Sequence, residues 1–341
     1  MPARCSPQPR LAGPAARRPG VARAPGRARV SGAAAPLTRR PAATGAAPVT
    51  PLPIVILPGL GNAASDYASL AAALLARGAP SVAIAPVARP DWLRNAAGLL
   101  RPEYWTGALT PAPTTDWYLA RIEAAVAAAR ASAGAGAEAS RVALVAHSAG
   151  GWLARTWLLG GGAASVASLT TLGSPHAPPP PDCGIPDQTR GILTWVEANT
   201  PGAFHPTIRY TTVASRYLKG APLLGGGQAG SRASGGAASP TLAARLAGTG
   251  YQALCGRADV WGDAITPVDT AHLAGAAQVT LEGVFHGPLG ATPDPEAGAG
   301  GDGSAGGAAK ARCWYGSAPI IDSWAPAALG LAPLGGRLLE A

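Results

Sequence analysis

Ser148 has the clearest chemical context in the chain, because it stands in the segment AHSAGG at residues 146–151. An apolar run precedes it and a helix-forming run follows at once, the pattern of a nucleophile elbow. So sharp a turn leaves space only for small residues two positions before and after the serine, here Ala146 and Gly150. The pattern predicts an activated serine that attacks an acyl carbonyl. We expect the neighbouring His147 to pack or hydrogen-bond locally.

Strand-forming and helix-forming segments alternate around this turn. We expect short strands at 54–57, 81–85, 141–147, 165–172, 207–215, 251–256 and 276–283. The first reads IVIL, an apolar and β-branched run that suits a strand covered on both faces. Helix-forming segments at 67–77, 116–132 and 152–159 separate the early strands. Such alternation predicts an α/β protein with a doubly wound, mostly parallel sheet and helices on both faces.

Three Gly- and Ala-rich stretches interrupt this pattern, at 134–138, 225–239 and 294–309. They carry too little apolar surface to offset the entropy lost on ordering, so we expect flexible surface insertions. A Pro-rich segment with the residues after it stands between two predicted strands, and we expect residues 178–206 to form a small lid over a site.

The net charge of +9 belongs to the N-terminus. The first 50 residues hold nine Arg and no acidic residue, and the rest of the chain is formally balanced. We therefore expect no nucleic-acid partner for the body of the chain. An Arg-rich, acid-free leader is typical of an organelle transit peptide, so residues 1–48 are predicted to be a disordered chloroplast address, with the mitochondrion as the alternative. A basic arm that binds an acidic partner is a further interpretation of the same residues.

The cysteines and the hydropathy pattern argue against a metal-binding, a disulfide-rich or a membrane-spanning protein. Cys5, Cys183, Cys255 and Cys313 stand far apart, without a CxxC pair or a neighbouring His at metal-ligand spacing. We expect no metal site, no cofactor and no disulfide framework. No apolar run approaches the about 18 residues that a membrane-spanning helix needs. A peripheral membrane contact through residues 178–206 remains an alternative, in which Trp195 and Phe204 face lipid instead of capping a pocket.

From residue 53 to about residue 325 the chain resembles the α/β-hydrolase family, within its lipase and esterase branch. The resemblance rests on four separated motifs in the family's order, beginning with PGLGN at 58–62 and AHSAGG at 146–151. It implies the α/β-hydrolase fold over residues 49–341. It also implies an oxyanion hole that is formed by the main-chain N–H groups of Leu60 and Ala149.

In this family an acid and then a base follow the nucleophile along the chain. The segment CGRADVWGDAITPVDTA offers Asp259 and Asp263 as the acid. The resemblance favours Asp263, because the family's acid often precedes a Val or Ile and a Pro at the spacing seen in DAITP. Asp259 remains the alternative, and Asp269 is expected to cap a helix. The base is His286, where a predicted strand runs out into a loop.

Two further sets of residues are candidates for contact with substrate. His176 closes the phrase TLGSPH, which resembles a strand-end motif that lines the site of lipase-like members, although a structural role is an equal alternative. Eight aromatic residues are candidates for an apolar acyl pocket or for the core. They are Trp92, Tyr104, Trp105, Trp117, Trp152, Trp195, Phe204 and Phe285.

The resemblance implies a serine hydrolase that cleaves a small-molecule or lipid ester through an acyl-enzyme. Similarity to plant and algal plastid lipases and, more distantly, to GPI inositol-deacylases suggests a lipid acyl ester. Two alternatives stay open. An acyltransferase would use the same triad with another acceptor in place of water, and a non-catalytic scaffold would keep the fold without chemistry.

Overall fold

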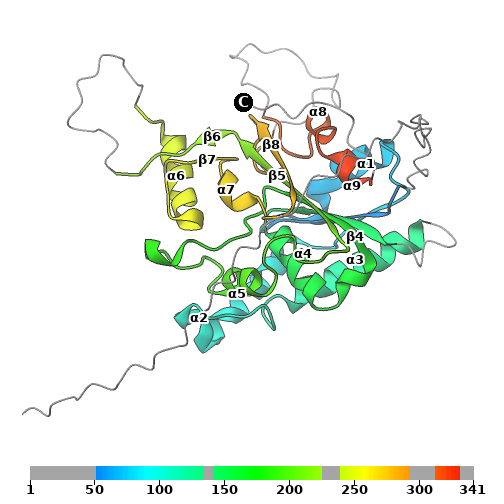
Figure 1. Cartoon of the computed structure of the whole chain (residues 1–341), viewed down its shortest axis with the longest axis horizontal. Coiled ribbons are helices and arrows are strands. Elements are labelled where there is room, and N and C mark those ends of the chain that lie inside the picture. The colour runs from blue at the N-terminus through cyan, green and yellow to red at the C-terminus, as the bar shows by residue number, and fades with distance from the viewer. Residues whose placement is uncertain (1–50, 134–140, 225–238, 292–311, 331–341) are drawn as a thin grey trace, which may run out of the picture. The chain divides into compact units, whose positions relative to one another are not determined.

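The computed structural model describes residues 51–133, 141–224, 239–291 and 312–330, all within the unit Ala47–Ala341 (Figure 1). The predicted leader at 1–48 lies outside these ranges. So do the three predicted insertions, apart from Ser239.

A parallel sheet of six strands forms the centre of the described part, in the order β2-β1-β3-β4-β5-β8. The strands are β1 Ile54–Leu57, β2 Val82–Ile84, β3 Val142–His147, β4 Val166–Leu172, β5 Arg209–Arg216 and β8 Ala277–Glu282. All residues of β1 and β3 are buried, as their apolar sequences require of strands covered on both faces. The predicted parallel sheet is confirmed.

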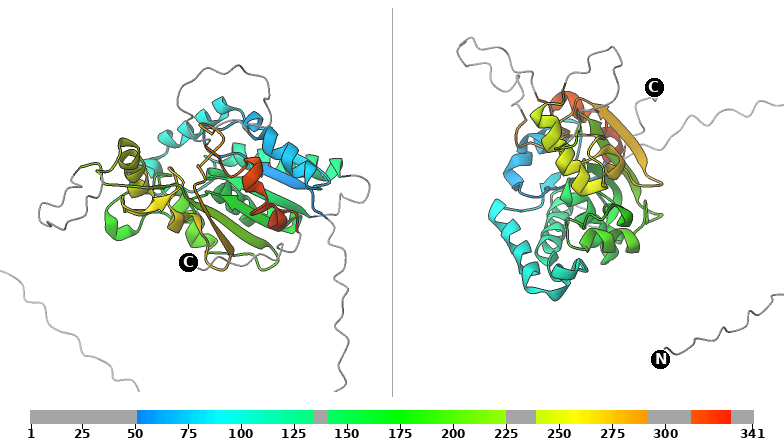
Figure 2. Two further views of the ribbon diagram at one scale, coloured as in Figure 1. Left: turned by 90° about the horizontal axis from the view of Figure 1, so that it is seen from above. Right: turned by 90° about the vertical axis from the view of Figure 1, so that its left-hand side faces the viewer.

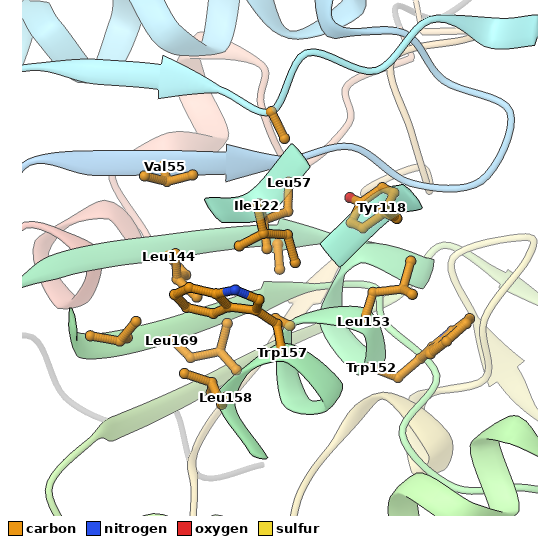
Figure 3. Packing of buried hydrophobic residues seen from close by; sticks show 14 of the residues in the cluster. Val55, Leu57, Tyr118, Ile122, Leu144, Trp152, Leu153, Trp157, Leu158 and Leu169 are labelled. Atoms are coloured by element: carbon orange, nitrogen blue, oxygen red, sulfur yellow. The ribbon is translucent and has the colours of Figure 1, made fainter. Parts of the chain in front are cut away.

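Helices cover both faces of this sheet (Figures 1 and 2). One core packs Val55 and Leu144 against α3 Asp116–Ser132, α4 Ala149–Leu159 and α5 Ile192–Asn199, as Figure 3 shows for α3 and α4. The alternate residues of the same strands, such as Ile54 and Val145, pack on the other face against three more helices. These helices are α1 Ala68–Ala76, α8 Ala318–Ile321 and α9 Ala325–Ala328. The prediction of a doubly wound α/β sheet is therefore correct.

The strand order places a topological switch point between β1 and β3. From β1 the chain crosses to β2 on one side, whereas from β3 it proceeds through β4 and β5 to the opposite edge. Loops that leave the carboxyl ends of two such neighbours diverge and leave a crevice, which is where open α/β sheets bind ligands. The loop 58–62 follows β1, and Ser148 follows β3.

Irregular and short elements connect the strands. They are η1 Ala64–Tyr67, η2 Arg89–Leu100, α2 Pro102–Thr106, η4 Gly162–Ser165, η5 Pro181–Cys183 and α7 Val268–Ala271. A second, antiparallel sheet pairs β6 Leu218–Lys219 with β7 Trp261–Gly262. The segment at 178–206 contains η5 and α5, and α5 contributes Ile192, Leu193 and Val196 to the main core.

The prediction of a strand at 251–256 is wrong, because these residues end the helix α6 Leu242–Cys255. Thr241 caps the helix by accepting a hydrogen bond from the N–H of Ala244, and Ala247, Tyr251 and Cys255 continue its buried face at helical spacing. Because the apolar run at the end of α6 is short, it carries no period of its own that separates a helix from a strand.

No helix in the described ranges is long and apolar enough to cross a membrane. Cys183, Cys255 and Cys313 are free thiols, and Cys5 lies outside the described residues. Trp195 packs partly buried against the main core, whereas Phe204 is 43% exposed.

Candidate active site

Ser148 occupies a strained position at the sharp turn between β3 and α4. Its φ of 52° lies in a region that residues with a side chain rarely adopt. The turn is held by two main-chain hydrogen bonds, from Ser148 N–H to the carbonyl of Leu172 and from Gly151 N–H to the carbonyl of Ser148, both 3.0 Å. The elbow thus presents the serine hydroxyl at the carboxyl edge of the sheet.

Three of the predicted residues form one hydrogen-bonded line. His286 Nε2 lies 3.0 Å from Ser148 Oγ, and His286 Nδ1 lies 2.8 Å from Asp263 Oδ2. Because the carboxylate can only accept, the neutral imidazole carries its hydrogen on Nδ1 and offers the Nε2 lone pair to the serine hydroxyl.

The other two acids of the predicted segment lie elsewhere. Asp259 is exposed, and Asp269 is paired with Arg257 at 2.6 Å on the surface. The structure thus brings Asp263, and neither alternative, to His286.

The Asp263 carboxylate is buried and surrounded by hydrogen-bond donors. Oδ1 accepts from the main-chain N–H groups of Ile265 at 3.0 Å and Thr266 at 2.7 Å. Oδ2 accepts from the hydroxyl of Tyr315 at 2.9 Å in addition to His286. Burial raises the pKa of Tyr315 well above its usual value, so the phenol stays a neutral donor. These donors replace the water that a buried carboxylate loses.

Asp263 does not follow a strand of the main sheet. It follows the short strand β7, and its loop is fastened to α6. The N–H of Ala264, a residue with a φ of 84°, donates to the hydroxyl of Tyr251 at 2.9 Å. The helix α6 therefore holds the loop that carries Asp263.

Gly173, just after β4, leaves room for the acid and the base. A methyl group at this position would lie 2.5 Å from Asp263 Oδ2 and 3.2 Å from His286 Nδ1. The residue also has a φ of 57°, which disfavours any side chain. The contact between acid and base therefore requires glycine here.

A second hydrogen-bond chain fastens the loops around Ser148 to one another. Gly59 N–H donates to the hydroxyl of Tyr67 at 2.9 Å, and this hydroxyl lies 2.7 Å from Nδ1 of His147. Nε2 of His147 lies 2.8 Å from the main-chain oxygen of His286. Only one arrangement of hydrogens satisfies every step, in which Tyr67 donates to Nδ1 and Nε2–H donates to the carbonyl.

This arrangement requires His147 to be neutral. Its burial, with a smaller contribution from His286, lowers the pKa of His147 to about 3. The expectation that His147 forms local hydrogen bonds was too narrow, because its ring connects Tyr67 to the loop that carries the base. Neither Tyr67 nor Tyr315 stands in one of the motifs from which the site is predicted.

The loop 58–62 passes directly against the nucleophile. A methyl group on Gly59 would lie 2.7 Å from Cβ of Ser148, so only glycine permits this approach. Leu60 and Ala149 both line the cavity beside the serine. Ala149 is also the first residue of α4, where a main-chain N–H has no acceptor within the helix and the helix dipole favours negative charge.

That cavity has a volume of about 180 Å³, and five of the residues that line it are aromatic. The rings of Trp92 and Trp117 meet edge to face at 5.2 Å, and each also contacts Tyr118. Four of the eight predicted aromatic candidates line the cavity: Trp92, Tyr104, Trp117 and Trp152. Trp92 and Tyr104 come from η2 and α2, for which no helix was predicted from the sequence. Phe285 lines a second, more open hollow beside α6.

His176 is buried away from this cavity. Its Nε2 lies 3.0 Å from the hydroxyl of Thr171, and its main-chain oxygen accepts from the guanidinium of Arg155 at 2.9 Å. Burial, with a smaller contribution from Arg155, holds the pKa of His176 well below its usual value. His176 is absent from the described residues that line the cavity. This geometry is that of a structural residue.

Comparisons with known proteins leave the family of the chain open. No protein-family profile matches the chain, and no curated protein matches it.

Among solved structures, the pyrethroid hydrolase PytH is 22% identical, with a TM-score of 0.24 over 38% of this chain and 42% of that one. A structure described with LipS and LipT, two metagenome-derived lipolytic enzymes, is 15% identical, with a TM-score of 0.31 over 49% and 74%. RedJ is 20% identical, with a TM-score of 0.23 over 52% and 75%.

The strand order, the crossovers on both faces and the elbow between β3 and α4 are those of the α/β-hydrolase fold.

Replacing Gly173 with Ala should separate the acid from the base. We expect a loss of stability of about 1–2 kcal/mol from the positive φ, together with a loss of about 100-fold in any activity that depends on His286. Gly78→Ala is the matched control, since Gly78 has a φ of 94° but space for a methyl group. It should lose only the stability that comes from the positive φ and keep the activity. Equal activity in the two variants would contradict the contact described for Gly173.

Stability should fall on acidification because buried His147 stays neutral. Its folded pKa of about 3 lies below the ordinary value, so the unfolded chain takes up the proton first as the pH drops below about 6.5. Between pH 7.5 and pH 5, His147 should account for about 2 kcal/mol of lost unfolding free energy. Urea unfolding gives the free energy of unfolding of the wild type and of His147→Asn at both pH values. The loss between pH 7.5 and pH 5 should be larger in the wild type, and the difference between the two losses is the contribution of His147. Identical losses would show that His147 is not held neutral.

Proposed function

We propose that this chain is a serine hydrolase that cleaves carboxylic esters. The observation that carries the proposal is the unbroken hydrogen-bonded line from Asp263 through His286 to Ser148, with distances of 2.8 and 3.0 Å. The line ends at a strained elbow beside a cavity with apolar walls. Nucleophile, base and acid in this geometry form the constellation that acyl transfer requires.

The first half of the reaction forms an acyl-enzyme. His286 Nε2 takes the proton of the Ser148 hydroxyl while Oγ attacks the ester carbonyl. Asp263 holds the imidazole with Nδ1–H toward its carboxylate and stabilises the imidazolium that results. The negative charge that develops on the carbonyl oxygen is stabilised by the N–H groups of Leu60 and Ala149. Collapse of the tetrahedral intermediate breaks the bond to the alcohol, which leaves with the proton from His286.

The second half returns the serine. Water takes the place of the alcohol, His286 removes its proton, and attack on the acyl-enzyme releases the acid and restores the Ser148 hydroxyl. If an alcohol or thiol outcompetes water at this step, the same residues carry out acyl transfer to that acceptor instead.

An apolar substrate group fits the wall beside Ser148. Trp92, Trp117 and Trp152 give the cavity apolar surface that matches a hydrocarbon chain or an aromatic ring. Together with the resemblance to plastid lipases, this wall supports the proposal that the substrate is a lipid acyl ester.

Asp263→Asn and Asp259→Asn test which acid serves the base. The amide at residue 263 leaves the shape of the site intact but removes the charge that fixes the tautomer of His286, so kcat should fall about 10³- to 10⁴-fold. Asp259 is exposed, and its amide should change kcat less than about twofold. Steady-state hydrolysis of p-nitrophenyl butyrate measures both. The reverse order of effects would move the role of the acid to Asp259.

A fluorophosphonate probe tests whether Ser148 is activated. We expect mass spectrometry of the labelled protein to place the adduct on Ser148, because His286 makes its hydroxyl nucleophilic. Ser148→Ala and His286→Ala should both abolish labelling, while circular dichroism shows that each variant folds. The wild type should also release free butyrate from p-nitrophenyl butyrate. Absence of labelling and turnover in a folded sample would favour a non-catalytic scaffold.

A further inference from the structure

Arg190 is the one charged residue among the described residues that line the cavity beside Ser148. Its side chain is half-buried, and its guanidinium lies over the ring of Tyr104 at 4.9 Å from the ring centre. Tyr104 lines the same cavity. A cation therefore borders a cavity whose other walls are neutral and mostly apolar.

No carboxylate among the described residues lies within ion-pair distance of this guanidinium. The acid nearest along the chain, Asp187, is engaged elsewhere, because its two oxygens accept four hydrogen bonds from the N–H and hydroxyl groups of Thr189 and Thr194. Glu103, beside Tyr104 on α2, binds Arg101 at 3.3 Å. The positive charge of Arg190 is thus left for another anion.

Several polar groups elsewhere in the wall are occupied within the protein. The indole N–H of Trp117 donates to the side-chain oxygen of Asn95 at 3.0 Å, and the hydroxyl of Tyr118 donates to the carbonyl of Pro58 at 2.6 Å. The hydroxyl of Thr115 donates to the carbonyl of Pro111 at 3.0 Å. Because Arg190 carries the positive charge of this wall, a substrate anion in the cavity would be drawn to it.

The main chain fixes Arg190 in an uncommon conformation. Its φ is 58°, its N–H donates to the carbonyl of Asp187 at 2.8 Å, and its carbonyl accepts from Leu109 N–H at 2.9 Å. Strained residues that are held in this way concentrate at sites that bind ligands. The guanidinium also has the planar fork of donors that binds a carboxylate with two hydrogen bonds.

We propose that Arg190 binds a carboxylate at the far end of the apolar part of the ester, so that the substrates are half-esters of dicarboxylic acids or esters of hydroxy acids. This inference rests on the proposed function, since it concerns the cavity beside Ser148. The volume of 180 Å³ limits the apolar part. An apolar cavity of about 150 Å³ holds benzene, so a linker of about six to eight carbons fills this one.

Matched pairs of esters test the proposal by kinetics. Monomethyl suberate against methyl octanoate places the charge on the acyl side, and 6-acetoxyhexanoate against hexyl acetate places it on the alcohol side. In at least one pair, Arg190→Met should lower the ratio of kcat/KM for the charged ester to that for the neutral one by about 10- to 100-fold. Arg190→Lys should lower it less, because an ammonium keeps the charge without the fork.

The control is Arg209→Met. Arg209 is the exposed first residue of β5, so it lies at the amino-terminal ends of the parallel strands, whereas Ser148 follows the carboxyl end of β3. It should leave both ratios unchanged. If Arg190→Met lowers kcat/KM equally for charged and neutral esters, its role is to pack on Tyr104 and the proposal is wrong. Unchanged ratios in both pairs would overturn it as well.

A binding measurement separates this proposal from the proposed function. Calorimetry of suberate with Ser148→Ala needs no turnover and should show binding that Arg190→Met weakens about tenfold or more in the same background. Arg190-dependent binding without ester hydrolysis by the wild type would sustain the anion site and refute the hydrolase. Hydrolysis of neutral esters without Arg190-dependent binding of suberate would refute the anion site alone.

Discussion

The buried carboxylate of Asp263 is the group on which the rest of the site depends. A charge that has lost its water must be surrounded by donors, and here the donors come from its own loop, from His286 and from Tyr315 beyond the last insertion. Segments far apart in the chain are therefore fixed by one anion. Asp263 directly follows β7 of the small antiparallel sheet, and His286 comes after β8 of the main sheet, so their hydrogen bond links the two sheets. Tyr251 of α6 holds the same loop through Ala264.

His286 is held from two directions. Its side chain is oriented by Asp263, while its main-chain oxygen accepts a hydrogen bond from His147. The same His147 ring connects through Tyr67 to Gly59, in the loop that passes Ser148. The loop 58–62 beside Ser148 and the loop that carries His286 are thus connected by buried hydrogen bonds between neutral groups, in addition to the bond from His286 to the Asp263 carboxylate.

Most of the sheet can be predicted from the sequence, because IVIL, VALVAH and SVASLTTL are apolar enough to indicate buried strands. The position of Ser148 can be predicted as well, because the small residues of AHSAGG are those that a sharp turn requires. Prediction from the sequence fails at 251–256, where a short apolar run has no clear period. It also misses Tyr67 and Tyr315, since a tyrosine that acts through a distant contact carries no local spacing signal. The transit peptide at 1–48 stays a prediction.

The cavity and the hydrogen-bonded line from Asp263 to Ser148 come largely from different parts of the fold. Ser148, Asp263 and His286 follow strands and are crowded by neighbours such as Gly173, whereas part of the cavity wall comes from η2, α2 and residues 188–192. Mutations in these connecting segments alter the shape and charge that a ligand meets without moving the sheet. In the proposed hydrolase, the residues that meet the substrate and the residues that react with it would therefore lie largely on different segments. Substrate range could then diverge, or be redesigned, in the connecting segments while the reacting groups stay in place.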